Sequence, residues 1–181
     1  MSKTLILIGL LAFVLGIGIA RHYLPQSSPA PVSEADGYTI VNVTGGKFGG
    51  DFTLFQGDKP VSPSDFHGKL VLMYFGFASC PDVCPTTLAI IASALRQLTP
   101  EELDMVQPVF ISIDPERDQG EKLDAYATYF HPRFIGITGT PDEVQKVVNQ
   151  YGGFFIKVES DSAMGYTVEH TSKTYIISKD G

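Results

Sequence analysis

Tryptophan is absent from this sequence of 181 residues, cysteine occurs only twice, and basic residues are scarce, with 13 Lys and Arg against 20 Asp and Glu. Two cysteines are too few for the disulfide framework of a small secreted domain. The formal net charge of −7 argues against nucleic acid as a partner, because phosphates attract clustered Lys and Arg. The two cysteines therefore predict a local site and not a scaffold.

Apolar residues are plentiful by comparison. They make up 44% of the chain and include 12 Phe and 8 Tyr, which is enough for a hydrophobic core and excludes disorder over most of the sequence. The length corresponds to one domain with an appendage.

The appendage has the pattern of a membrane anchor. Residues 5–20 form an unbroken apolar and glycine run, and residues 4–24 as a helix would cross a hydrocarbon core of roughly 30 Å. No clean small-x-small cleavage motif follows, so we favour a retained anchor over residues 1–24 and keep a cleaved signal peptide as the alternative. Residues 25–36, rich in Pro and Ser, predict an extended tether. Residues 37–181 then form the globular domain, outside the cytosol.

Segments of strand and helix character alternate in that domain. Strands are predicted at residues 38–43, 52–55, 69–77, 108–113 and 134–137, and helices at residues 88–98, 120–130 and 141–151. Residues 154–158 and 174–177 predict two antiparallel strands around a polar loop. This order predicts an α/β, thioredoxin-like fold with extra N-terminal β-strands. Because such a fold normally closes with a further helix, we expect the chain to lack its last helix.

The two cysteines lie between a buried strand and a helix. Pro85 belongs in the first helical turn, which makes Asp82 the N-cap and places Cys84 within that turn. Since a helix N-terminus favours anions, we expect Cys84 to ionise more readily than an ordinary thiol. Cys80 and Cys84 can either bind one soft metal ion or close a disulfide. Dithiol redox enzymes usually have Cys-x-x-Cys, so the wider spacing here favours a metal.

A soft ion held by two thiolates needs a third ligand, and the chain has four histidines. His170 is the favoured one, because the loop before the last strand of a thioredoxin-like fold faces the cysteine turn. His22 lies at the predicted membrane edge and His67 in a turn. His131 ends a predicted helix before Pro132, where a C-terminal histidine commonly interacts with the helix dipole.

Several segments resemble the SCO/SenC family, membrane-tethered copper proteins that help to assemble cytochrome c oxidase. They are residues 74–85 (YFGFASCPDVCP), 113–118 (IDPERD) and 130–141 (FHPRFIGITGTP), together with the late His170. The resemblance implies copper bound by Cys80, Cys84 and His170. It also implies a copper-receiving subunit of the oxidase and a thiol reductant as partners, and a bacterial inner membrane with the domain facing the periplasm.

Other interpretations stay open. Asp114, Arg117 and Asp118 either hold the metal loop, present a docking face, or form only a local turn with an ion pair, and Asp82 either tunes the charge of the site or only caps the helix. The main competing function is a thiol-disulfide oxidoreductase that reduces cysteines of the oxidase copper site. A metallochaperone is favoured over an enzyme. Zinc with two Cys, one His and water is chemically possible.

Overall fold

The computed structural model describes residues 33–35, 38–40 and 48–181, and the chain divides into two compact units, residues 1–46 and 47–181. In the first unit, β1 (Ser33–Ala35) pairs with β2 (Tyr38–Ile40) as an antiparallel hairpin. The predicted anchor lies outside the described residues. Among the residues that are described, no helix combines the length and the apolar character needed to cross a membrane.

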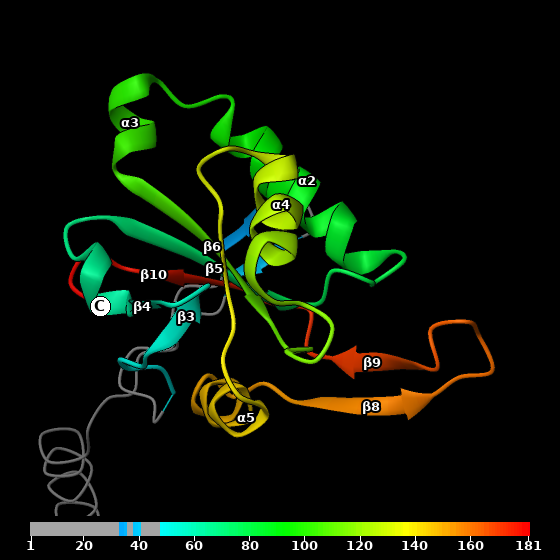
Figure 1. The fold of residues 1–181 in the computed structure, drawn as a ribbon. Coiled ribbons are helices and arrows are strands. Elements are labelled where there is room, and N and C mark those ends of the chain that lie inside the picture. Colours follow the sequence, from blue (N-terminus) through cyan, green and yellow to red (C-terminus); the bar gives the residue numbers. More distant parts are fainter. Residues whose placement is uncertain (1–32, 36–37, 41–47) are drawn as a thin grey trace, which may run out of the picture. The chain divides into compact units, whose positions relative to one another are not determined.

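A four-stranded sheet forms the centre of the second unit (Figure 1). Its strands, in spatial order, are β10 (Thr174–Ile177), β5 (Leu70–Gly76), β6 (Val106–Ser112) and β7 (Ile135–Ile137). β5, β6 and β7 run parallel, whereas β10 runs antiparallel to β5. The continuous apolar stretches of β5 and β6 give strands that are buried on both faces, as the sequence predicts.

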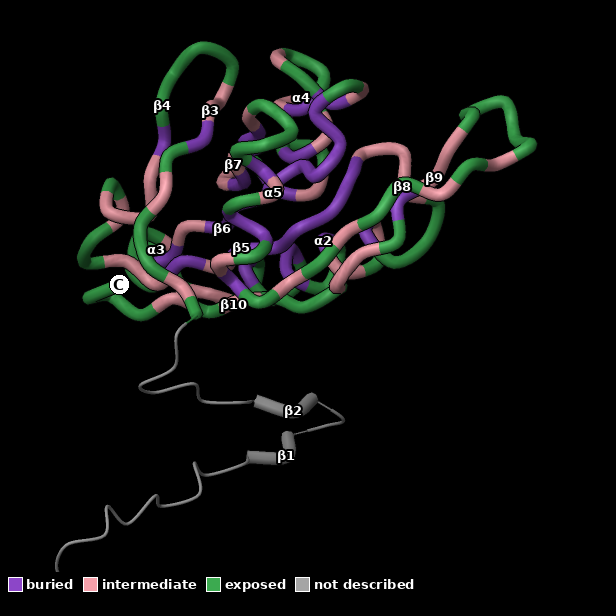
Figure 2. Tube along the Cα trace, turned by 90° about the horizontal axis from the view of Figure 1, so that it is seen from below, coloured by how far each residue is buried: buried purple, intermediate pink, exposed green. Residues whose placement is uncertain are grey.

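Helices cover both faces of this sheet (Figure 1). α2 (Val83–Leu95) and α4 (Gly120–Phe130) lie on one face, α5 (Pro141–Gln150) lies on the other, and the short α3 (Pro100–Asp104) precedes β6. The α/β architecture expected from the sequence is therefore confirmed. The core between these layers is rich in aromatic side chains that are at most 2% exposed, namely Tyr74, Phe75, Phe77, Phe110 and Phe134. Figure 2 shows the buried segments gathered along β5, β6 and the inner sides of the helices.

Two hairpins and a 3₁₀ helix, η1 (Pro63–Phe66), complete the unit. β3 (Leu54–Gln56) and β4 (Lys59–Val61) form one hairpin, which meets the end of β7 through a bridge between Phe55 and Thr138. β8 (Phe155–Glu159) and β9 (Tyr166–His170) form the other. The predicted pairing of residues 154–158 with residues 174–177 is wrong. β8 pairs with β9, a strand that the prediction treats as loop, and β10 joins the central sheet instead.

Candidate functional site

The two thiols lie where β5 leads into α2. Cys80 is half-buried in the connecting loop, Cys84 is fully buried in the first turn of α2, and both are free thiols. Gly76, the last residue of β5, makes room for this arrangement. A Cβ atom at Gly76 would lie 2.9 Å from the Cys84 Sγ atom, so only glycine lets the thiol pack this closely against the strand.

His170, the last residue of β9, brings its imidazole to the same place. Its Nε2 atom lies 3.5 Å from Cys84 Sγ, and its Nδ1 atom lies 3.0 Å from the carbonyl oxygen of Thr171. A carbonyl oxygen only accepts, so Nδ1 carries the proton and Nε2 keeps its lone pair. The Cys84 thiol then donates to Nε2. This is the tautomer that a metal-binding histidine adopts when a backbone carbonyl holds its other nitrogen.

Aromatic side chains surround the Cys84 thiol and the His170 imidazole. The rings of Tyr74 and Phe77 meet the His170 ring edge-on, with centroids 6.3 and 5.9 Å away. The Tyr74 hydroxyl donates to Cys84 Sγ over 3.8 Å. Burial lowers the pKa of His170, although its hydrogen bond to the Thr171 backbone opposes the shift. The imidazole is therefore neutral near pH 7 and available as a ligand.

The environment of Cys84 overturns one prediction made from the sequence. Burial, to which the proximity of the Cys80 thiol adds, raises the pKa of Cys84 to about 12, although a hydrogen bond with the Phe77 backbone opposes the shift. The expected low pKa at a helix start is wrong, because loss of solvation outweighs the helix dipole at a fully buried thiol. Asp82 does occupy the N-cap position, but its side chain makes no capping hydrogen bond.

Of the other candidate ligands, the two that the structure describes, His67 and His131, are not brought to this site. His131 is buried at the end of α4, where its Nδ1 accepts a hydrogen bond from the Arg133 backbone, and His67 follows η1. His22 lies outside the described residues. Within the described part of the chain, no three Cys, His, Asp or Glu side chains gather closely enough to hold an ion as they stand. Of the predicted ligands Cys80, Cys84 and His170, the last two are in direct contact.

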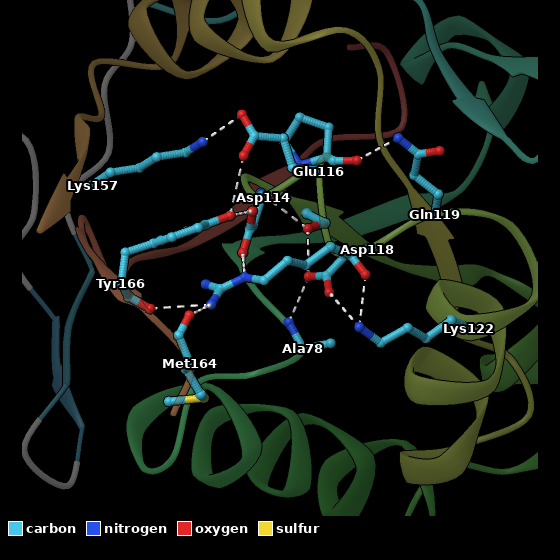
Figure 3. A network of polar contacts seen from close by, with 12 residues as sticks. Ala78, Asp114, Glu116, Asp118, Gln119, Lys122, Lys157, Met164 and Tyr166 are labelled. Atoms are coloured by element: carbon cyan, nitrogen blue, oxygen red, sulfur yellow. Dashed lines mark hydrogen bonds and ion pairs between the residues drawn. The ribbon is translucent and has the colours of Figure 1, made fainter. Parts of the chain in front are cut away.

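Asp118 connects the turn after β6 to the loop before α2, which carries Cys80 (Figure 3). Its carboxylate is fully buried and accepts hydrogen bonds from the Ala78 backbone at 2.7 Å and from the Ser112 hydroxyl at 2.8 Å. Ala78 lies two residues before Cys80. A buried carboxylate with strong donors of this kind fixes the backbone of the loop.

Asp114 and Arg117 connect the same turn to β9. The Arg117 guanidinium forms an ion pair with the buried Asp114 carboxylate, which also accepts a hydrogen bond from the Tyr166 hydroxyl at 2.7 Å. Because Asp114 and Asp118 are fully buried, they do not form an exposed docking face. Their contacts are those expected of residues that hold the loop.

Sequence reasoning missed the roles of four residues in this region: Tyr74, Gly76, Phe77 and Tyr166. Glycine inside an apolar strand was a usable signal at position 76, because it marks a close approach to the backbone. The alternation of Tyr166, Val168 and His170 with polar residues was a usable signal for β9. No local pattern distinguishes Tyr74 or Phe77 from ordinary core residues.

Comparison with known proteins shows which family this chain is similar to. A family model described as SCO1/SenC matches residues 42–181. The SCO2-like protein of Rickettsia conorii is 37% identical over 181 residues, which span 99% of this chain and 85% of that protein.

Solved structures are similar as well. The structure of Bradyrhizobium japonicum ScoI with copper bound is 38% identical and covers 74% of this chain and 85% of its own, with a TM-score of 0.68. BsSco, described with a disulfide switch and as a member of the Sco family of cytochrome c oxidase assembly proteins, is 26% identical with a TM-score of 0.55, over 73% of this chain and 77% of its own. The thioredoxin-like fold of these neighbours is the fold of residues 48–181.

Proposed function

Since this chain belongs to the SCO1/SenC family, we propose that it is a membrane-tethered carrier that takes up copper and supplies it to the binuclear copper site of cytochrome c oxidase. The observation that carries the proposal is the 3.5 Å contact between Cys84 Sγ and His170 Nε2. A buried thiol that faces the lone pair of a neutral imidazole, with a second thiol nearby, is a donor set suited to copper.

Copper is the cargo, and we assign its binding to Cys80, Cys84 and His170. Thiolate sulfur suits Cu(I), whereas imidazole nitrogen also accommodates Cu(II). The high pKa of the Cys84 thiol means that uptake displaces a proton from it, so binding weakens as the pH falls. The Nδ1 bond to the Thr171 carbonyl keeps Nε2 directed at the site during this exchange.

Delivery then consists of ligand exchange. Thiols of the receiving oxidase subunit replace Cys80 and Cys84 one at a time, and the half-buried Cys80 is the natural first ligand to leave. A thiol reductant is needed as a second partner, because two neighbouring thiols outside the cytosol become oxidised and then bind no metal.

The place of action that we propose is the outer face of a bacterial inner membrane. Residues 1–24 anchor the chain, residues 25–36 act as the tether, and residues 37–181 carry the copper in the periplasm. The apolar run at residues 5–20 supports this assignment. Terminal sequencing of the protein purified from membranes tests it, and a mature N-terminus near residues 26–30 would contradict a retained anchor.

Anaerobic titration of the reduced, detergent-solubilised full chain with equal Cu(I) and Zn(II), followed by metal analysis, tests the function. We expect one copper per chain and no zinc. Cys80→Ala and Cys84→Ala should each reduce copper uptake to background, whereas the neighbouring control Ser79→Ala should bind as the original chain does. Zinc in place of copper, or full copper uptake by Cys84→Ala, would contradict the proposal.

A thiol-disulfide oxidoreductase is the second candidate, and the free thiols of Cys80 and Cys84 favour it. In that case the pair would reduce a disulfide of the oxidase copper site and become a disulfide itself. His170 takes no part in such an exchange. Reduction of a model disulfide peptide that proceeds equally in the original chain and in His170→Ala, without any copper uptake, would favour this function over copper delivery.

A further inference from the structure

The hairpin that carries His170 is attached to the rest of the domain by side chains and not by strand pairing. β8 and β9 form a sheet of their own, and neither strand pairs with the central sheet. Figure 1 shows the hairpin projecting beyond the helices. The position of the His170 imidazole over Cys84 therefore depends on side chains that attach β9 to the domain.

Tyr166, at the start of β9, makes the closest of these attachments (Figure 3). Its hydroxyl donates to Asp114 at 2.7 Å, and its backbone carbonyl accepts a hydrogen bond from Arg117 Nη1 at 3.0 Å. The guanidinium of Arg117 also lies 3.8 Å from the centre of the Tyr166 ring. One residue of β9 is thus held by a hydroxyl bond, a backbone bond and a cation–π contact.

The turn that holds Tyr166 also holds the loop before α2, which carries Cys80. Asp118, next to Arg117, accepts the hydrogen bond from the Ala78 backbone, and Asp114 is buried beside it. Arg117 also lies 5.9 Å from the centre of the Phe77 ring, whose edge-on contact with His170 is 5.9 Å between centroids. The turn at residues 114–118 is therefore in contact with both segments that carry the proposed ligands.

We propose that Tyr166, held by Asp114 and Arg117, is a positioning residue that keeps His170 over the thiols and thereby decides whether the site accepts Cu(II). The inference rests on the proposed function. Cu(I) is held by two thiolates in near-linear geometry without the imidazole, whereas Cu(II) requires nitrogen and a higher coordination number. A displaced β9 then weakens the binding of Cu(II) and leaves that of Cu(I) unchanged.

Tyr166→Phe tests this, because it removes one hydroxyl and keeps the ring under Arg117. Loss of a residue that orients a metal ligand typically costs about 10- to 100-fold in affinity. We expect Cu(II) affinity to fall by about tenfold or more and its thiolate charge-transfer absorption to change, with Cu(I) affinity within about twofold. Tyr129→Phe is the control, since Tyr129 is 84% exposed on α4.

A metal-free measurement separates this inference from the proposed function. Hydrogen exchange of the β9 amides in reduced Tyr166→Phe should accelerate while the amides of β5 and α2 keep their rates. Arg117→Lys, which keeps the charge beside Asp114 but loses the fork of donors, should give the same pattern. Faster exchange at β9 in a chain that binds no copper would refute copper delivery but support the positioning role. The positioning role would be overturned if both variants kept the β9 exchange rates and the Cu(II) affinity of the original chain. It would also be overturned if the affinities for Cu(I) and Cu(II) fell equally.

Discussion

At the scale of single residues, Cys84 is subject to two opposing influences. The first turn of α2 offers unpaired N–H groups that favour a thiolate, while complete burial favours the neutral thiol. Burial prevails and raises the pKa of Cys84 to about 12. The Cys84 thiol is therefore protonated near pH 7, and a metal ion that bound its sulfur would have to displace that proton.

Thiol alkylation tests this balance. In Cys80→Ala, where Cys84 is the only thiol, we expect the iodoacetamide rate to stay low at pH 8 and to rise only well above pH 9, because burial persists without Cys80. The same variant in denaturant should react as an ordinary thiol, with a midpoint near 8.5. A folded-state midpoint below about 8.5 would mean that the helix start controls Cys84 after all.

His131 is a second residue whose pKa is set by burial and not by the helix dipole. Burial lowers the pKa of His131, and the guanidinium groups of Arg96 and Arg133 add to the shift. Its Nδ1 accepts the Arg133 N–H, which requires an unprotonated nitrogen. The expectation that a charged His131 serves the dipole of α4 is therefore wrong.

The pH dependence of stability follows from this shift. The unfolded chain takes up a proton near pH 6.5 that the folded chain binds less well, so the free energy of unfolding should fall as the pH drops below about 6.5. His131→Asn removes this contribution and keeps an acceptor for Arg133. Urea unfolding between pH 5 and 8 should show a shallower decline for the variant, and identical slopes would exclude the contribution of His131.

At the scale of elements, the sequence predicts the helices and strands that have a characteristic pattern within a few neighbouring residues. The Thr140-Pro141-Asp142-Glu143 stretch predicts the start of α5, and the structure has the full capping box there. The same signature at Thr99-Pro100-Glu101-Glu102 begins α3, a helix of five residues that the sequence-based assignment does not include. The partner of β8 was predicted wrongly, because strand pairing depends on contacts between distant segments that no local pattern records.

Removing the N-terminal cap of α5 should lower the free energy of unfolding by a predictable amount. Thr140 Oγ1 accepts from the Glu143 backbone at 3.3 Å, and Glu143 accepts from the Thr140 backbone at 2.8 Å. Thr140→Ala should lower the free energy of unfolding by about 1 kcal/mol, whereas Thr140→Ser, which retains the hydroxyl, should stay close to the original chain. Chemical denaturation measures both, and an equal loss in the two variants would show that the hydroxyl bond is not the cause.

At the scale of the whole molecule, the candidate site is a product of tertiary structure. Cys84 and His170 are 86 positions apart, and their meeting requires α2 to follow β5 while β9 leads into β10. The sequence identified these residues because the cysteine spacing is local and the family motif is specific. It did not identify Tyr166 or Gly76, since their roles depend on which side chains approach them in the folded chain.

The affinities of His170→Ala for the two copper ions decide whether His170 completes a copper site with Cys80 and Cys84. Competition titrations should show Cu(II) affinity falling by more than about tenfold, while Cu(I) affinity falls far less, because two thiolates hold Cu(I) alone. Disulfide formation between Cys80 and Cys84 should survive the substitution. An unchanged affinity for Cu(II) would show that His170 is not a copper ligand and that the copper site lacks its third donor.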